Sequence, residues 1–137
     1  MAVIKNLIQT EADGSISFGN YELPAKKKLA DYEHEGDLYK VKTYSEITRL
    51  ERNEMFVYES VPGTAVSHLR YLDNGMEFVV EGPKDAQITV EGEGGTFYNV
   101  FINDAERASQ KTNLGGKLSF SVELANAGPV TVRIEKA

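Results

Sequence analysis

The chain has 137 residues, which suits a single domain of ~100–150 residues built around one hydrophobic core. Its net charge is −6, and residues 1–60 and residues 61–137 each carry −3. No cluster of Lys and Arg is large enough to follow a nucleic-acid backbone, so we expect no nucleic-acid partner. The absence of cysteine excludes disulfides, thiolate metal sites and cysteine nucleophiles.

The first nine residues do not have the features of a targeting segment. They lack the basic start and the apolar core of ~7–15 residues that a signal peptide needs. No stretch approaches the ~18 consecutive apolar residues of a membrane-spanning helix. We therefore expect a cytoplasmic protein with no membrane partner, and leave export by another route open.

Strand patterns are sparse in the first fifty residues. Residues 15–19 and residues 37–44 are the two predicted strands there, because apolar and polar side chains alternate along them. Between them, residues 24–37 form a polar connection that we expect on the surface. Residues 44–52 fit two structures: a helical turn capped by Ser45, or a strand over residues 47–51.

From residue 54 onward, strand patterns recur at a spacing of roughly 8–12 residues. The predicted strands are residues 54–60, 64–72, 76–82, 86–92, 96–103, 117–124 and 129–137. Asp73-Asn74-Gly75 is the strongest tight-turn signal, because Asn and Gly tolerate positive φ angles. Residues 91–95 are predicted to join their flanking strands as a hairpin, and polar residues 104–113 to form a short strand or a loop between sheets.

These patterns predict an all-β fold, namely an antiparallel β-sandwich that is Ig-like or jelly-roll-like, with an N-terminal β-rich extension. The best domain boundary lies near Asn53. Residues 54–137 are then the sandwich, and residues 1–53 a β-rich segment that packs on it or extends it.

Two predicted strands carry apolar residues on both faces. Phe97 and Phe101 lie opposite the core-facing residues of their strand, and Met55 and Val57 lie opposite two further aromatic residues. Such a strand must be covered on both sides, by the N-terminal segment or by another subunit. We therefore expect a homo-oligomer, with Met55, Val57, Phe97 and Phe101 as interface residues.

The densest polar cluster is residues 31–37, which hold four carboxylates and one of the two histidines. A hard cation such as Ca²⁺ takes about six to eight oxygen ligands, and such a loop supplies several. The spacing matches neither an EF-hand nor the H-E-x-x-H zinc motif, so we favour a solvated acidic loop, with a cation or contact site as the alternative. The residues concerned are Asp31, Glu33, His34, Glu35 and Asp37.

No catalytic residue, metal ligand set or cofactor is predicted. Ser60 and Ser67 are near His68 in the sequence, but the G-x-S-x-G motif of serine hydrolases is missing. Seven tyrosines offer platforms for sugar rings, although the chain has no tryptophan. We favour a protein that is not an enzyme and acts through self-assembly or partner binding. The alternative is a carbohydrate-binding module with a glycan as partner.

Three segments, residues 7–21, 36–43 and 55–64, resemble short bacterial proteins, common among clostridia-like anaerobes, that carry the label endosialidase. The last of them reads Met-Phe-Val-Tyr-Glu-Ser-Val-Pro-Gly-Thr. The C-terminal strands resemble small β-sandwich accessory modules of polysaccharide-active enzymes. The label implies a glycan hydrolase, which we disfavour because a six-bladed sialidase propeller at ~40–50 residues per blade exceeds 137 residues.

Overall fold

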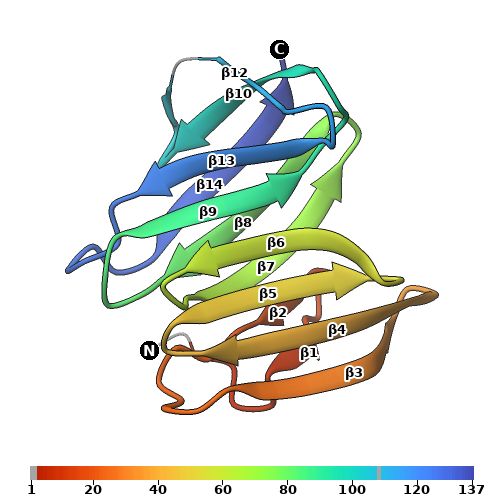
Figure 1. Cartoon of the computed structure of the whole chain (residues 1–137), viewed down its shortest axis with the longest axis vertical. Helices are drawn as coiled ribbons and strands as arrows, with labels where there is room; N and C mark the ends of the chain where they lie inside the picture. Colours follow the sequence, from red (N-terminus) through yellow and green to blue (C-terminus); the bar gives the residue numbers. More distant parts are fainter. Residues whose placement is uncertain (1–2, 108) are drawn as a thin grey trace.

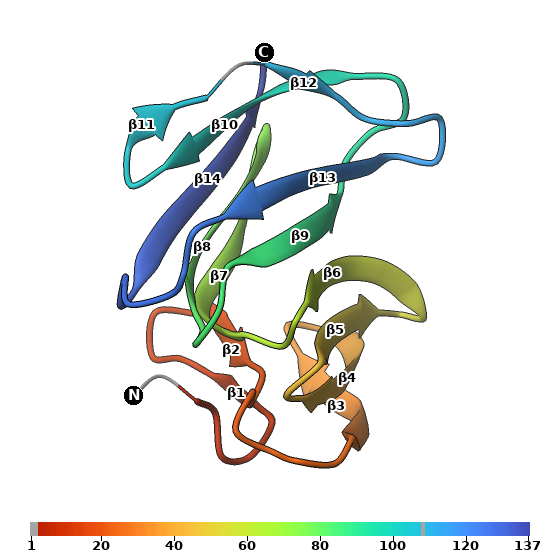
Figure 2. The ribbon, with the colours of Figure 1, turned by 60° about the vertical axis from the view of Figure 1, so that its left-hand side comes forward.

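The computed structural model describes residues 3–107 and 109–137. Fourteen strands and no helix occur in these residues, and the strands form two antiparallel sheets that face each other (Figures 1 and 2). The all-β sandwich predicted from the sequence is confirmed. No helix of this described part is long and apolar enough to cross a membrane.

The two sheets, which we name A and B, are built from strands far apart in sequence. Sheet A has the order β1 (Ile8–Thr10), β2 (Ile16–Phe18), β7 (Ala65–Leu72), β8 (Gly75–Glu81), β14 (Val130–Lys136), β10 (Phe97–Ile102) and β11 (Ala105–Glu106), with β12 (Gln110–Lys111) also paired to β10. Sheet B has the order β13 (Lys117–Val122), β9 (Ala86–Glu91), β6 (Met55–Val61), β5 (Ile47–Arg52), β4 (Asp37–Tyr44) and β3 (Lys27–His34).

The first fifty-odd residues contribute to both sheets. Strands β1 and β2 continue sheet A beyond β7, and β3 to β5 continue sheet B beyond β6. Asn53 and Glu54 form the tight turn between β5 and β6, and both have positive φ angles of 51° and 69°. This conformation matches the twist of a two-residue hairpin.

The hydrophobic core lies between the sheets and follows the alternation of side chains along each strand. Strand β14 shows this most clearly. It buries every second residue, namely Val130, Val132 and Ile134, and turns the residues between them outward. Tyr58 is at the centre of the core. Its ring meets Phe18 and Phe78 of sheet A edge-on, at centroid distances of 5.3 and 5.5 Å, so that it joins the two layers.

A buried hydrogen-bond network closes one end of the sandwich, where the chain passes from β6 to β7. The hydroxyl of Thr48 donates to the carbonyl oxygen of Thr64 at 2.8 Å and accepts the Thr64 N–H at 3.1 Å. Thr43 Oγ1 lies 2.8 Å from Thr48 Oγ1, and the hydroxyls of Tyr58 and Ser60 each lie 2.8 Å from Thr64 Oγ1. All five side chains are fully buried, so their polar atoms depend on one another.

The predicted hairpin around residues 91–95 is wrong. Strand β9 pairs with β6 and β13 in sheet B, whereas β10 pairs with β14 in sheet A. The intervening residues cross from one layer to the other, and Gly92 packs against Tyr98 so closely that a Cβ would lie 2.9 Å from its ring. Glycine is therefore needed here for close packing, not for a two-strand turn.

The structure also tests two predictions about the first fifty-odd residues: one is wrong, and in the other one of two alternatives is correct. Residues 24–37 are not a loop throughout, because β3 occupies Lys27–His34 and pairs with β4. This edge strand buries only its last residue, His34, so its sequence shows no apolar alternation. Of the two structures that fit residues 44–52, the strand is correct and is β5.

Candidate functional site

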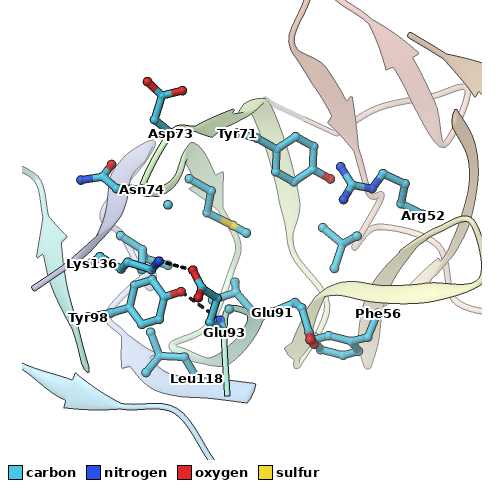
Figure 3. A pocket seen from close by; sticks show the side chains of 16 residues that line it. Arg52, Phe56, Tyr71, Asp73, Asn74, Glu91, Glu93, Tyr98, Leu118 and Lys136 are labelled. Carbon is cyan, nitrogen blue, oxygen red and sulfur yellow. Dashed lines mark hydrogen bonds and ion pairs between the residues drawn. The ribbon is translucent and has the colours of Figure 1, made fainter. Parts of the chain in front are cut away.

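The end of the sandwich away from the hydroxyl network holds a cavity of about 240 Å³, drawn in Figure 3. It lies where β5 ends and β6 begins in sheet B, and where β7 ends and β8 begins in sheet A. Core residues that reach this open end form an apolar floor: Val57, Met76, Val90, Leu118 and Ile134. The rim is polar and consists mainly of Arg52, Tyr71, Asp73, Asn74, Glu91, Glu93 and Lys136.

Arg52 and Tyr71 form one wall of this cavity. The guanidinium carbon of Arg52 lies 4.5 Å from the centroid of the Tyr71 ring, an arrangement in which the cation faces the aromatic surface. The Tyr71 hydroxyl lies 3.2 Å from the hydroxyl of buried Tyr39, which fixes the ring. Burial raises the pKa of Tyr71, so the phenol stays neutral.

The opposite wall carries acidic groups that already have partners. Glu93 forms an ion pair with Lys136, and the Glu93 N–H donates to the Tyr98 hydroxyl at 2.9 Å (Figure 3). Glu91 forms an ion pair with Lys117 at 2.6 Å. The cavity therefore has charged groups around an apolar floor, and the two glutamates are held by lysines of the chain itself.

A second cavity of about 290 Å³ begins on the far side of Arg52 and Tyr71, which line both. We call the two cavities together the groove. The second is more polar, because the turn between β3 and β4 and the side chain of Arg70 contribute to it. Three residues of the predicted acidic loop line it: His34, Glu35 and Asp37.

The predicted acidic loop is a β-hairpin end whose side chains already have partners. His34 Nδ1 lies 2.9 Å from Thr10 Oγ1, and His34 Nε2 lies 3.1 Å from a carboxylate oxygen of Glu35. The Asn53 amide donates to the Asp37 carboxylate at 2.9 Å. Asp31 and Glu33 lie in β3, outside the residues that line the groove. Within residues 3–107 and 109–137, no three His, Cys, Asp or Glu side chains are placed to hold a metal ion.

The four predicted interface residues have different surroundings. Val57 is only 5% exposed and belongs to the core, so its prediction as an interface residue is wrong. A bulge in the pairing of β5 with β6 turns both Val57 and Tyr58 inward, which a strict alternation does not anticipate. Met55 and Phe97 are 69% and 53% exposed.

Cationic side chains cover the aromatic residues on the outer faces of the sheets. The guanidinium carbon of Arg133 lies 4.3 Å from the ring centroid of half-buried Phe101. Lys117 lies 4.7 Å from the ring centroid of Phe56, which also has Arg49 at 5.2 Å. Long cationic side chains shield apolar surface with their aliphatic parts, so the chain itself supplies cover for these rings.

The structure also brings together Asp13, Ser15 and His68, a group not predicted from the sequence. Ser15 Oγ donates to Asp13 at 2.5 Å, and His68 Nδ1 lies 3.1 Å from Ser15 Oγ and 3.4 Å from Asp13. A catalytic triad needs the serine and the acid on different ring nitrogens, whereas both approach Nδ1 here. The serine proton also points to the aspartate, so this group is not an activated nucleophile.

Comparison of the chain with family models, with curated proteins and with solved structures gave no match. The resemblance to the endosialidase-labelled proteins therefore stays a prediction.

Sequence reasoning predicted the residues of the groove only in part: Tyr71 is one of the seven tyrosines considered as platforms for sugar rings, whereas nothing singled out Arg52 or Lys136. Arg52, Tyr71 and Lys136 come from three different strands and carry no common motif. Two turn signals lie near the groove, Asp73-Asn74-Gly75 and residues 91–95, and neither indicates which side chains face it.

Proposed function

We propose that the chain is a non-catalytic binding protein and that the groove binds a saccharide ring. A sugar ring has an apolar C–H face and a polar edge, which suits an apolar floor surrounded by hydrogen-bonding groups. The observation that carries the proposal is Tyr71, which is 42% exposed beside the floor and is held by Arg52 and Tyr39. A fixed aromatic ring at such a position is a stacking platform.

The size of the first cavity supports a ligand of one ring. An engineered cavity of ~150 Å³ in another protein holds benzene, so a cavity of about 240 Å³ has room for a six-membered ring with substituents. The second cavity gives space for a substituent or for a linked unit beyond Arg52 and Tyr71.

The arrangement of the carboxylates supports binding without hydrolysis. A glycoside hydrolase needs two carboxyl groups that face each other across the scissile bond, one of them as a proton donor. Glu91 and Glu93 are instead each bound to a lysine, Lys117 or Lys136. The cluster of Asp13, Ser15 and His68 likewise lacks the geometry of a hydrolase triad.

The test is a binding screen on a glycan array that includes neutral and acidic sugars, with three proteins: wild type, Tyr71→Ala and Tyr44→Ala. Tyr44 is a half-buried tyrosine of β4 outside the groove and serves as the matched control. Loss of the Tyr71 ring should weaken binding about tenfold, corresponding to ~1.5 kcal/mol of aromatic contact. Absence of binding to every glycan, or equal binding by Tyr71→Ala, contradicts the proposal.

We propose self-association as a second candidate, on a separate observation. Two exposed apolar side chains, Phe97 and the 95% exposed Leu114, lie at the outer edge of sheet A. They belong to residues 95–98 and 110–114, two segments joined by backbone hydrogen bonds. Exposed apolar side chains on one edge favour contact with a second copy. Light scattering should give a mass above the 15.2 kDa of one chain for wild type, and 15.2 kDa for Leu114→Ser. A monomeric wild type at micromolar concentration would contradict self-association.

A further inference from the structure

One arginine in the groove, Arg52, forms no ion pair with a carboxylate of residues 3–107 and 109–137. Arg49, Arg70 and Arg133 each lie within ion-pair distance of two carboxylates. Arg107 is exposed outside the groove. Arg52 lines both cavities and forms no ion pair with any residue that the structure describes.

The contacts of Arg52 orient its charge without neutralising it. Its guanidinium lies against the ring of Tyr71, whose hydroxyl is 3.2 Å from the Tyr39 hydroxyl. Burial raises the pKa of Tyr71, so this phenol carries no charge that would neutralise Arg52. Asp37 lines the second cavity with Arg52 and its charge acts on the guanidinium, but the two form no ion pair, and the Asp37 carboxylate accepts a hydrogen bond from Asn53.

The acidic residues at the other rim do not occupy the position beside Arg52. Figure 3 shows Asp73 directed away from the cavity and Arg52 directed toward Tyr71. Glu93 is turned to Lys136 in the same view, and Glu91 is bound to Lys117. On the side of the first cavity, a ligand group next to Arg52 therefore meets a cation rather than an acid.

We infer that the ligand of the groove carries a carboxylate, and that Arg52 binds it. A guanidinium presents two parallel N–H donors that match the two oxygens of a carboxylate, and partial burial strengthens the pairing. The inference rests on the proposed function and narrows its substrate class to acidic sugars such as uronates. The ring lies on the apolar floor, and its carboxylate points to the junction of the two cavities.

The experiment measures the affinities of glucuronate and glucose by calorimetry, since the two share a ring and differ in the carboxylate. Wild type should bind glucuronate about 10- to 100-fold more tightly than glucose, as expected for a charge-assisted hydrogen-bonded pair. Arg52→Gln should remove this preference, because it should lower the glucuronate affinity about 10- to 100-fold more than the glucose affinity. Arg107→Gln, which removes an exposed charge outside the groove, should keep the preference.

The outcomes separate the inference from the function on which it rests. Equal binding of both sugars by wild type, or a preference that survives Arg52→Gln, overturns the role of Arg52 and leaves a neutral-sugar site. No binding of either sugar overturns both. Arg52→Lys keeps the charge but loses the paired donors, so an intermediate preference is expected from it, and it serves in place of Arg52→Gln if that variant unfolds.

Discussion

Replacement of Thr48 by valine tests how much the buried hydroxyl network contributes to stability. Valine has nearly the same shape but removes the hydroxyl that donates to the Thr64 carbonyl and accepts the Thr64 N–H. It also leaves the hydroxyl of Thr43 without its acceptor at 2.8 Å. Each buried polar group without a partner costs ~1–3 kcal/mol, and the groups are coupled, so we expect a total loss of ~2–4 kcal/mol.

The assay is urea denaturation followed by circular dichroism, with Thr131→Val as the matched control. Thr131 is exposed on the outer face of β14, so its replacement should change the free energy of unfolding by less than ~0.5 kcal/mol. For Thr48→Val the midpoint should fall at unchanged m-value, and the melting temperature by ~5–15 °C. If the two variants differ from wild type by the same small amount, the network does not hold this end of the sandwich together.

Three further predictions concern stability and are measured by the same denaturation assay. Gly75→Ala should lower the free energy of unfolding by ~3 kcal/mol, because a Cβ there would lie 1.7 Å from the Ile134 carbonyl oxygen and would force β8 and β14 apart. A decrease below ~1 kcal/mol would contradict this packing. Burial raises the pKa of Tyr58 well above its usual value, so the free energy of unfolding should keep its full value below about pH 10 and decline above it. The decline should be less steep in Tyr58→Phe. The same decline in wild type and Tyr58→Phe would contradict this. Hydrogen bonds from the hydroxyl and N–H of Ser15 hold the pKa of Asp13 well below its usual range, so the free energy of unfolding should fall as the pH drops below about 4. Asp13→Asn should make this decline smaller. An equal decline in wild type and Asp13→Asn would contradict the role of Asp13.

Most of the fold was predictable because most strands have one buried face. Strands β4 and β14 alternate along their whole length, and their predicted positions agree with the structure. Edge strand β3 was missed because it buries one residue, which leaves no pattern to read. The crossing between β9 and β10 was mistaken for a hairpin, because glycines that allow a turn also allow close packing between layers.

The site was less predictable, for two physical reasons. A single bulged residue shifts the alternation, so Val57 lies in the core although its neighbours suggested an outward face. The groove depends on which strands end at the same end of the sandwich, and that follows from long-range pairing. Arg52 and Tyr71 are joined by a contact at 4.5 Å between two different sheets, which no local pattern specifies.

The most direct test of the groove as a binding site is a nuclear magnetic resonance titration of the wild-type protein with glucuronate. The account predicts backbone amide shifts confined to the residues around Arg52, the β7–β8 turn and residues 91–93, which surround the first cavity. Shifts on another surface, or no shifts at millimolar sugar, would contradict the assignment of the groove as the binding site.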